Sequence, residues 1–174
     1  MNLQKNNMRF LLILLFGCVS LTSYGLSSDR KKIMTIVAES VEINNAKGVS
    51  KYDGNVLVRQ GSMKIIANTV LVFHNKKRQI KHIIAIGRPA RYKVRPDKEP
   101  YDLNASARRL EYFPAKNLMV MTKKARVKQG PRDFRSNLIK YNLVTNKVDA
   151  GRTSTGQGTP GRVNITILPD KKAK

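Results

Sequence analysis

The sequence predicts an all-β protein built by internal duplication, and three observations support that fold class. Apolar and polar residues alternate along most of the chain after residue 33. Residues that favour turns divide this alternation into short segments. A block of sequence also recurs at a fixed offset of 69 residues. Together these features predict many short antiparallel strands in a sandwich or barrel.

The duplication appears as six residues that recur in the same order, each 69 positions later. Conservative pairs such as Val41 and Leu110 lie between the identities. A fixed period of this kind indicates that one supersecondary unit is used twice. The identical residues are Ala38, Glu42, Val58, Gln60, Gly61 and Asn68, which return as Ala107, Glu111, Val127, Gln129, Gly130 and Asn137.

The alternation of apolar residues has a period of two, which is typical of half-buried strands. Its members are rich in Val, Ile and Tyr, which suit a pleated surface. In the first half the alternating residues are Ile36 and Ala38, Val41 and Ile43, Val56 and Val58, Met63, Ile65 and Ala67, and Val70 and Val72. In the second half they are Leu110 and Tyr112, Met119 and Met121, Ala125 and Val127, Ile139 and Tyr141, and Val163, Ile165 and Ile167.

Turn-forming residues mostly recur every 7 to 15 positions or so, near the spacing expected of an all-β domain. Asp53-Gly54 is the strongest hairpin signal. Pro96–Pro100 is predicted to separate the two copies of the repeat, and Gly151–Gly161 to form a flexible loop. Neither copy buries much surface alone, so we expect one continuous sheet. The other predicted turns are Asn44–Gly48, Gln60–Gly61, His74–Lys77, Gly87–Pro89, Phe113–Asn117 and Gly130–Pro131.

The first 25 residues have the layout of a secretory signal. Lys5 and Arg9 precede an unbroken apolar run from Phe10 to Phe16, and Ser23 and Gly25 provide small residues for cleavage after Gly25. A retained membrane anchor is the alternative interpretation, but a spanning helix needs roughly 20 apolar residues and this run is shorter. We therefore expect a signal at residues 1–25, one exported domain at 26–168 and a basic tail at 169–174.

Cys18 is the only cysteine and lies inside the predicted signal. The exported chain is therefore expected to have no disulfide, no thiol nucleophile and no cysteine metal ligand. Leu15-Phe16-Gly17-Cys18 resembles a lipidation sequence, with Phe16 as an unusual residue in it, so lipidation at Cys18 is a further alternative.

The predicted mature chain is strongly basic. Loss of Lys5 and Arg9 with the signal leaves 32 basic and 11 acidic residues, a formal charge of +21. Such a surplus favours polyanionic partners such as nucleic acid, a phosphorylated glycolipid or an anionic membrane surface. Runs of like charge are also common on solvated surfaces, so the basic clusters do not decide among these partners.

The sequence gives no support for catalysis. His74 and His82 are the two histidines, and neither has neighbours typical of a triad or a metal site. No glycine-rich phosphate-binding motif follows a predicted strand. We therefore predict a protein that is not an enzyme and that uses no metal and no cofactor.

Three segments resemble the OstA-like family of periplasmic lipopolysaccharide-transport proteins. They are Ile36–Ser40, Gly54–Gly61 and Ile65–Val72, and the second copy repeats them more loosely from Ala105 to Tyr141. The Gly-Asn-Val-x-Val-x-Gln-Gly sequence beginning at Gly54 is the most specific of these similarities. Gly87-Arg88-Pro89-Ala90 is similar to a turn of the family. The resemblance covers most of residues 35–168.

The resemblance implies a twisted, open β-jellyroll with a V-shaped section, whose apolar inner face receives the acyl chains of lipid A. It also implies head-to-tail homo-oligomers that bridge the periplasm through edge strands, with LptC-like and LptD-like proteins at the two ends. Unpaired sheet edges allow strand addition of this kind. The predicted edge strand at the C-terminus carries Val163, Ile165 and Ile167, and the strand around residues 35–43 forms the other edge.

The family's lipid-contacting first strand corresponds to Ile36 and Ala38. Other inward-facing candidates follow from alternation, although strand periodicity does not distinguish a groove from a closed core. These candidates are Ile43, Val56, Val58, Ile65, Val70, Val72, Leu110, Tyr112, Val127, Ile139 and Tyr141.

Two alternatives to the transport bridge stay open on sequence alone. One is a membrane-anchored relative of the LptC type, which shares the fold. The other is an exported polyanion-binding module. Proteins that bind single-stranded nucleic acid usually combine basic residues with stacking aromatics, and this chain has no Trp and few other aromatic residues. Export also argues against nucleic acid as the partner.

Overall fold

The computed structural model describes residue 29 and residues 31–96, 99–151 and 162–167. The predicted signal at 1–25, almost all of the predicted loop at 151–161 and the basic tail at 169–174 lie outside the described residues. No helix within the described ranges is long and apolar enough to span a membrane.

The described chain is almost entirely antiparallel β-structure, as the alternation predicts. A single short 3₁₀ helix, η1 (Pro114–Lys116), forms the turn predicted at residues 113–117. The strands are β1 (Met34–Val37), β2 (Ser40–Asn44), β3 (Val49–Gln60), β4 (Met63–His74), β5 (Ile80–Val94), β6 (Leu103–Phe113), β7 (Leu118–Gln129), β8 (Arg132–Asn142), β9 (Val148–Ala150) and β10 (Asn164–Ile167).

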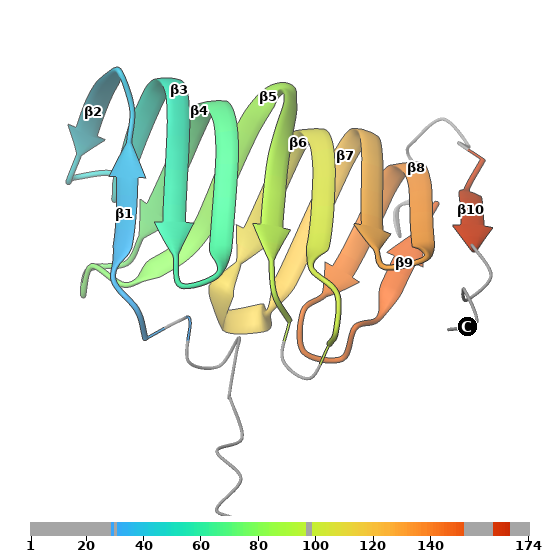
Figure 1. Ribbon diagram of the computed structural model, residues 1–174. Helices are drawn as coiled ribbons and strands as arrows, with labels where there is room; N and C mark the ends of the chain where they lie inside the picture. The colour runs from blue at the N-terminus through green and yellow to red at the C-terminus, as the bar shows by residue number, and fades with distance from the viewer. Residues whose placement is uncertain (1–28, 30, 97–98, 152–161, 168–174) are drawn as a thin grey trace, which may run out of the picture.

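All ten strands belong to one sheet, in the order β1-β3-β4-β5-β6-β7-β8-β10, with β2 also pairing β3 and β9 also pairing β8. Figure 1 shows the strands following one another along the molecule from β1 and β2 at one end to β9 and β10 at the other. The two copies therefore form one continuous sheet, as expected.

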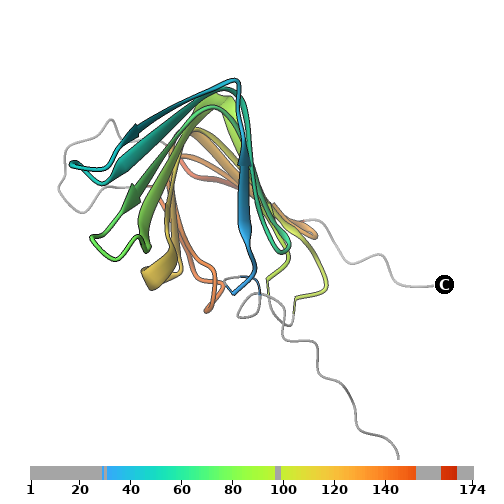
Figure 2. The same ribbon diagram turned by 90° about the vertical axis from the view of Figure 1, so that its left-hand side faces the viewer.

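The sheet folds along a ridge into two arms, which gives the V-shaped section seen in Figure 2. The first arm contains β1, β10 and residues 56–60, 63–67, 90–94, 103–107, 125–129 and 132–136. The second arm contains β2, β9 and residues 49–53, 69–74, 80–86, 109–113, 118–122 and 138–142. Every pair of long strands changes register where it crosses from one arm to the other.

The ridge explains two errors in the predicted turns. The prediction of a hairpin at Asp53-Gly54 is wrong, because β3 runs through these residues and stays paired with β4 on both sides. Gly87–Pro89 likewise lies inside β5 rather than between strands. Glycine is favoured at position 54 because its φ is +81°. Glycine and proline normally end a strand, but at the ridge they only bend it. The central strands are therefore longer than alternation indicates.

The duplication is visible in the strand boundaries, which match at the offset of 69. β3 covers residues 49–60 and β7 covers 118–129. β4 begins at Met63 and β8 at Arg132. The copies differ at the ridge: β6 is continuous where its counterparts β1 and β2 are separate, and β5 is continuous where β9 and β10 are separate. The two end positions of the sheet are thus each occupied by a strand broken at the ridge.

Candidate functional site

The space between the arms is lined by three ladders of inward-facing side chains that cross the whole sheet. On the first arm a ladder of apolar and aromatic side chains runs from β1 to β10 through directly paired residues. Cross-strand neighbours on one face of a sheet lie in contact distance, so this ladder forms a continuous apolar strip. Its members are Ile36, Val58, Ile65, Tyr92, Ala105, Val127, Phe134 and Ile165.

Two further ladders run along the inner face of the second arm from β2 to β9. The one nearer the ridge is Val41, Tyr52, Val70, Ala85, Leu110, Met121, Ile139 and Ala150. The one nearer the open side of the V is Ile43, Ser50, Val72, Ile83, Tyr112, Met119, Tyr141 and Val148. Ser50 is the one position among these sixteen without an apolar or aromatic side chain.

The vertex of the V is filled by small side chains. Val56, Ala67, Ala90, Ala107 and Ala125 are at most 6% exposed where the strands pass from one arm to the other. Because the arms converge here, little room is left for a longer side chain. The alanines therefore set how closely the two arms approach.

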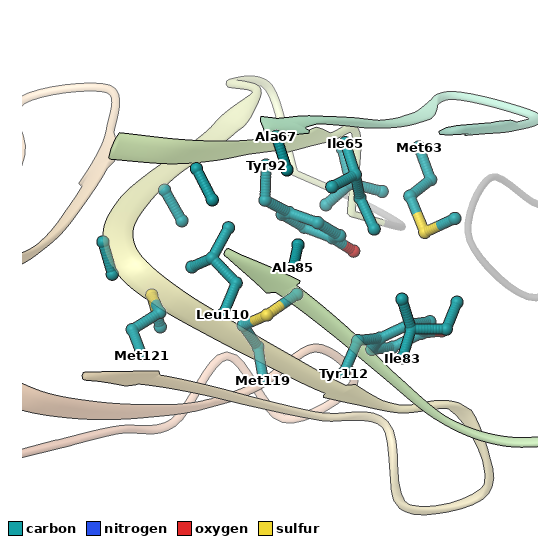
Figure 3. Packing of buried hydrophobic residues seen from close by; sticks show 14 of the residues in the cluster. Met63, Ile65, Ala67, Ile83, Ala85, Tyr92, Leu110, Tyr112, Met119 and Met121 are labelled. Carbon is teal, nitrogen blue, oxygen red and sulfur yellow. The ribbon is translucent and has the colours of Figure 1, made fainter. Parts of the chain in front are cut away.

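The arms pack directly against one another in the middle of the sheet. Figure 3 shows Ile65 and Tyr92 of the first arm lying across from Tyr112 and Met119 of the second. The rings of Tyr92 and Tyr112 are 6.2 Å apart between centroids, within the range of a favourable aromatic pair. These side chains are between 1% and 4% exposed, so the interior is closed in its central part.

Twelve of the thirteen residues predicted to contact lipid lie in this interior or against it. Ile43 differs, because its side chain is 59% exposed on the edge strand β2. Sequence reasoning missed Tyr92, Ala85, Ala105 and Phe134, which lie on the same ladders. For Tyr92 and Ala85, the missed signal is the period-two pattern on both sides of Gly87–Pro89, which the turn prediction interrupted. Whether lipid contacts these residues stays a prediction.

The ladders become exposed at both ends of the molecule. Val41 and Ile43 on β2 are 55% and 59% exposed, and Ile165 and Ile167 on β10 are 55% and 72% exposed. Val163, just before β10, is 37% exposed. The strip that is buried in the centre is therefore open at the edges, where β1 and β2 lie at one end and β9 and β10 at the other.

Two polar atoms inside this apolar space have no hydrogen-bond partner among the described residues. They are the Tyr92 hydroxyl and the Gln129 Nε2. A buried polar group without a partner costs about 1–3 kcal/mol. Burial also raises the pKa of Tyr92 well above its ordinary value, so this phenol keeps its proton and is available as a donor.

A chain of polar contacts fastens the open sides of the arms together in the second copy. The Tyr141 hydroxyl is 3.2 Å from Gln129 Oε1 and 3.0 Å from Asn146 Oδ1. Asn146 Nδ2 donates to Glu99 Oε1 at 2.8 Å, and Glu99 also pairs with Arg132 at 3.7 Å. Burial raises the pKa of Tyr141 to about 12. We call Glu99, Gln129, Arg132, Tyr141 and Asn146 the polar clasp.

The outer faces of the two arms differ strongly in charge. Alternation places eight cations on the outside of the first arm, namely Arg59, Lys64, Arg91, Lys93, Arg95, Arg126, Lys128 and Arg135. Two acids, Asp102 and Asp133, lie among them. The second arm has three outward cations, Lys51, Arg109 and Lys140, against four acids, Glu42, Asp53, Glu111 and Asp149.

Both acids of the first arm are held by two cations. The Arg126 guanidinium donates to the Asp133 carboxylate at 2.7 and 2.9 Å, and Arg135 donates to it at 3.1 Å. Arg126, and then Arg135, hold the pKa of Asp133 below its usual value. Arg95 and Lys93 do the same for Asp102.

The two histidines give no sign of a catalytic or metal site. His82 stacks between Phe73 and Phe113, and its Nε2 is 3.0 Å from Glu111 Oε2. Within the described ranges, no group of three or more His, Cys, Asp or Glu side chains is placed to hold a metal ion.

Comparison with known proteins identifies the family. Residues 35–147 match the family described as "LptA/(LptD N-terminal domain) LPS transport protein". The chain belongs to the LptA/LptD N-terminal domain family. The resemblance found in the sequence is thus confirmed, and members of the LptA/LptD family are transport proteins rather than enzymes.

Two relatives and one crystal structure illustrate the similarity within the LptA/LptD family. The lipopolysaccharide export system protein LptH of Pseudomonas aeruginosa is 33% identical over 175 residues, covering 96% of this chain and 100% of the relative. LptA of Escherichia coli K12 is 27% identical over 133 residues, covering 75% of this chain and 71% of the relative. The crystal structure of LptH superimposes with a TM-score of 0.74 at 30% identity, covering 82% of this chain and 99% of that one.

The fold and the compartment follow from these relatives. The β-jellyroll architecture is shared with LptH, which is the periplasmic component of the lipopolysaccharide-transport device in its organism. The chain is accordingly a periplasmic protein of the LptA/LptD family, as the export signal predicts.

Proposed function

We propose that this protein carries lipopolysaccharide across the periplasm, with the lipid A acyl chains between its two arms. The observation that carries the proposal is the set of three apolar ladders that cross the sheet from edge to edge and are exposed at both ends. An acyl chain lying along the ladders exchanges water for apolar contacts, which favours binding by roughly 0.8 kcal/mol for each buried CH₂ group.

Lipid entry requires the arms to separate. Tyr92, Tyr112 and Met119 are at most 4% exposed, which leaves no room for an acyl chain beside them. The exposed ladder ends on β1, β2, β9 and β10 are the places where a chain first finds apolar surface. Separation of the arms also frees the Tyr92 hydroxyl to donate to an ester or amide oxygen of the ligand, since it has no partner among the described residues.

The same ends are proposed to join protomers head to tail. β1 and β2 present one broken edge of the sheet and β9 and β10 present the other. Pairing β10 of one copy with β1 of the next places Ile165 beside Ile36 and continues the ladder of the first arm. Such a heterologous contact extends without closing. LptC-like and LptD-like partners are proposed to bind the two terminal edges in the same way.

A photo-crosslinking experiment tests the interior as the lipid site. A photoreactive amino acid at Ile36, which faces inward, is expected to crosslink lipopolysaccharide. The control is Val37, the next residue on β1, which pairs with Leu57 on the outer side and is 63% exposed. Val37 and Leu57 are expected to give little product. Equal labelling at the inner and outer positions would contradict the proposal.

The alternative of an exported polyanion-binding module is favoured by one observation, the eight cations on the outside of the first arm. Binding through exposed charges is screened by salt, with a Debye length of about 8 Å at physiological ionic strength. If the interior holds the acyl chains, lipopolysaccharide binding is expected to weaken with salt and to persist. Complete loss of binding at moderate salt would support the polyanion module instead.

A further inference from the structure

A hollow of about 1090 Å³ lies on the outer side of the ridge, away from the interior. It is bounded by the irregular segments of β5 and β7 and crossed by β6. Arg88, Arg108, Lys123 and Lys124 line it, together with Asn68 and Ser106. We call it the ridge hollow. The four cationic side chains are all exposed.

The hollow forms because the neighbouring strands differ in length at the ridge. Between the pairs Ile86–Arg109 and Ala90–Ala107, β5 has three residues where β6 has one. Between the pairs Thr122–Leu138 and Ala125–Ser136, β7 has two residues where β8 has one. The unequal lengths disrupt the ladder locally, and β6 lies between β5 and β7 in the sheet. Arg88 therefore comes from β5, Lys123 and Lys124 from β7, and Arg108 from β6 between them.

The first copy of the repeat provides a comparison for the residues that line the ridge hollow. At the offset of 69, Glu39 corresponds to Arg108, and Gly54 and Asn55 correspond to Lys123 and Lys124. In the first copy the corresponding residues hydrogen-bond to each other, because Asn55 Nδ2 donates to Glu39 Oε1 at 2.5 Å. In the second copy the carboxylate and the amide are both replaced by cations, so no such bond forms.

Lys123 and Lys124 both have a left-handed backbone conformation. Gly54 and Asn55 have φ values of +81° and +44°, and Lys123 and Lys124 have +64° and +57°. Gly and Asn accept the left-handed region readily, whereas two consecutive lysines there are unfavourable. Strain of this kind is commonly held at functional sites. The second copy thus has cations where the backbone favours other residues.

The charge in the hollow is not neutralised by the described residues. Arg109, at its margin, pairs with Glu111 at 2.6 Å, but no described carboxylate pairs with Arg88, Arg108, Lys123 or Lys124. Elsewhere on the outer surface, Asp102 and Asp133 each hold two cations. Four like charges around one concavity repel one another, and a bound anion relieves that repulsion.

We propose that the ridge hollow binds a saccharide that carries at least two phosphate groups. Arg88 on β5 and the two lysines on β7 are separated by β6, and this separation suits two distinct phosphates. Asn68 and Ser106 provide amide and hydroxyl groups for sugar hydroxyls, and Ile86, which is 38% exposed, provides an apolar surface for a ring face. The site lies on the opposite side of the sheet from the acyl interior and is independent of it.

Calorimetric titration of the purified chain with glucose 1,6-bisphosphate tests the proposal, with glucose 6-phosphate as the single-phosphate comparison. The variant Lys123→Asn/Lys124→Asn removes two charges and suits the left-handed backbone, so its thermal midpoint is expected to be unchanged or higher. Its affinity for the bisphosphate is expected to fall at least tenfold. The control Lys76→Asn/Lys77→Asn removes the same charge from the exposed turn between β4 and β5 and is expected to change affinity less than twofold. Lys123→Arg/Lys124→Arg is expected to retain binding.

Several results would overturn the proposal. Equal losses of bisphosphate affinity in the ridge and control variants would indicate that the ligand is held by diffuse charge attraction. Equal affinity for the mono- and bisphosphate would exclude paired phosphate sites. Binding of anionic phospholipid vesicles with no binding of the bisphosphate would make the ridge a membrane contact.

Deacylated lipopolysaccharide distinguishes two sources of the ligand. If deacylated lipopolysaccharide displaces the bisphosphate from the unmodified chain, the ligand is the sugar phosphates of lipopolysaccharide. If the bisphosphate stays bound, the ligand is a free sugar phosphate. Crosslinking from Ile36 is expected to be the same in every ridge variant, so failure of this proposal and failure of the transport proposal are distinguishable.

Discussion

The same apolar ladders are buried at the centre of this sheet and exposed at its ends. In the centre, Ile65, Tyr92 and Val127 of the first arm are at most 2% exposed. At the ends, Ile43 and Ile165 are 59% and 55% exposed. The side chains are of the same kind and the ladders are continuous, so the difference lies in the neighbours. A residue at the centre has strands on both sides and the other arm above it, and a residue at an end lacks one side.

The comparison teaches that the ladders stabilise the fold only where they are covered. At the ends they remain available to a second copy, a partner or a ligand. Substitutions in the two regions should therefore separate stability from association.

The largest effect is expected from a cavity in the centre. Leu110 is 2% exposed, and Leu110→Ala is expected to lower the free energy of unfolding by about 2–5 kcal/mol. The matched change at an end, Ile43→Ala, removes an exposed side chain and is expected to cost less than about 0.5 kcal/mol. Urea denaturation followed by circular dichroism measures both. Similar losses at the two positions would show that the ends are covered in solution.

A charge on the inner side of β10 is expected to act on association instead. Ile165→Lys places an ammonium group on the ladder beside Phe134, and Thr166→Lys places the same group on the outer side beside Asp133. The inner change is expected to weaken head-to-tail association about tenfold or more, since about 1.4 kcal/mol of lost apolar burial suffices for that factor. Sedimentation velocity over a range of concentrations is the measurement. If the unmodified chain is monomeric at high concentration, the proposed head-to-tail association is wrong.

Deletion of residues 162–174 removes β10 together with the basic tail. We expect a folded monomer that still binds lipid weakly, because β8 and the central ladders remain. A truncated chain with unchanged oligomers would exclude β10 as the interface.

The polar clasp is expected to make a smaller contribution that is confined to the second copy. Asn146→Gly removes the contacts to Tyr141 and Glu99 while keeping a residue suited to its φ of +55°. The loss of stability is expected to be about 1–2 kcal/mol, with faster lipid uptake because the arms separate more easily. Asn117→Gly is the control, since Asn117 has a φ of +50° and lies outside the clasp. Equal effects of the two substitutions would assign the loss to glycine alone.

The smallest effect is expected from the outer carboxylates. The pKa of Asp133 is lowered in the folded protein, chiefly by Arg126. Its contribution to stability is therefore present above the unfolded value of about 3.9 and is lost as the pH falls through the lower folded value. Asp133→Asn is expected to flatten the decrease in stability below about pH 4 while changing stability at pH 7 by about 1 kcal/mol or less. A parallel pH profile for the variant would show that this carboxylate is not linked to folding.

The strand pattern and most turns were predictable because both are local. Alternation placed Ile36, Val58 and Val127 on one face, and the structure puts all three on one ladder. Tyr92 was missed because Gly87–Pro89 has turn chemistry and yet bends a continuous strand. The length of a strand depends on its neighbours, which local patterns do not describe.

The contacts between the arms were not predictable, since they join residues that are distant in sequence. Tyr92 meets Tyr112, and Asn146 meets Glu99 across 47 residues. The closed centre of the interior depends on such contacts, so periodicity alone could not separate a core from a groove. The ridge hollow likewise combines Arg88, Arg108 and Lys123, which separate strands bring together.

The strand order has a consequence for how the protein folds and opens. From β3 to β8, every strand pairs with its successor in the chain, so each of these pairings is a hairpin. Each hairpin closes only a short turn, so little loop entropy is lost before its first contacts form. The same order lets the sheet fray one strand at a time from its ends. Amide hydrogen exchange should therefore be slowest in β5 and β6 and progressively faster toward β1 and β10.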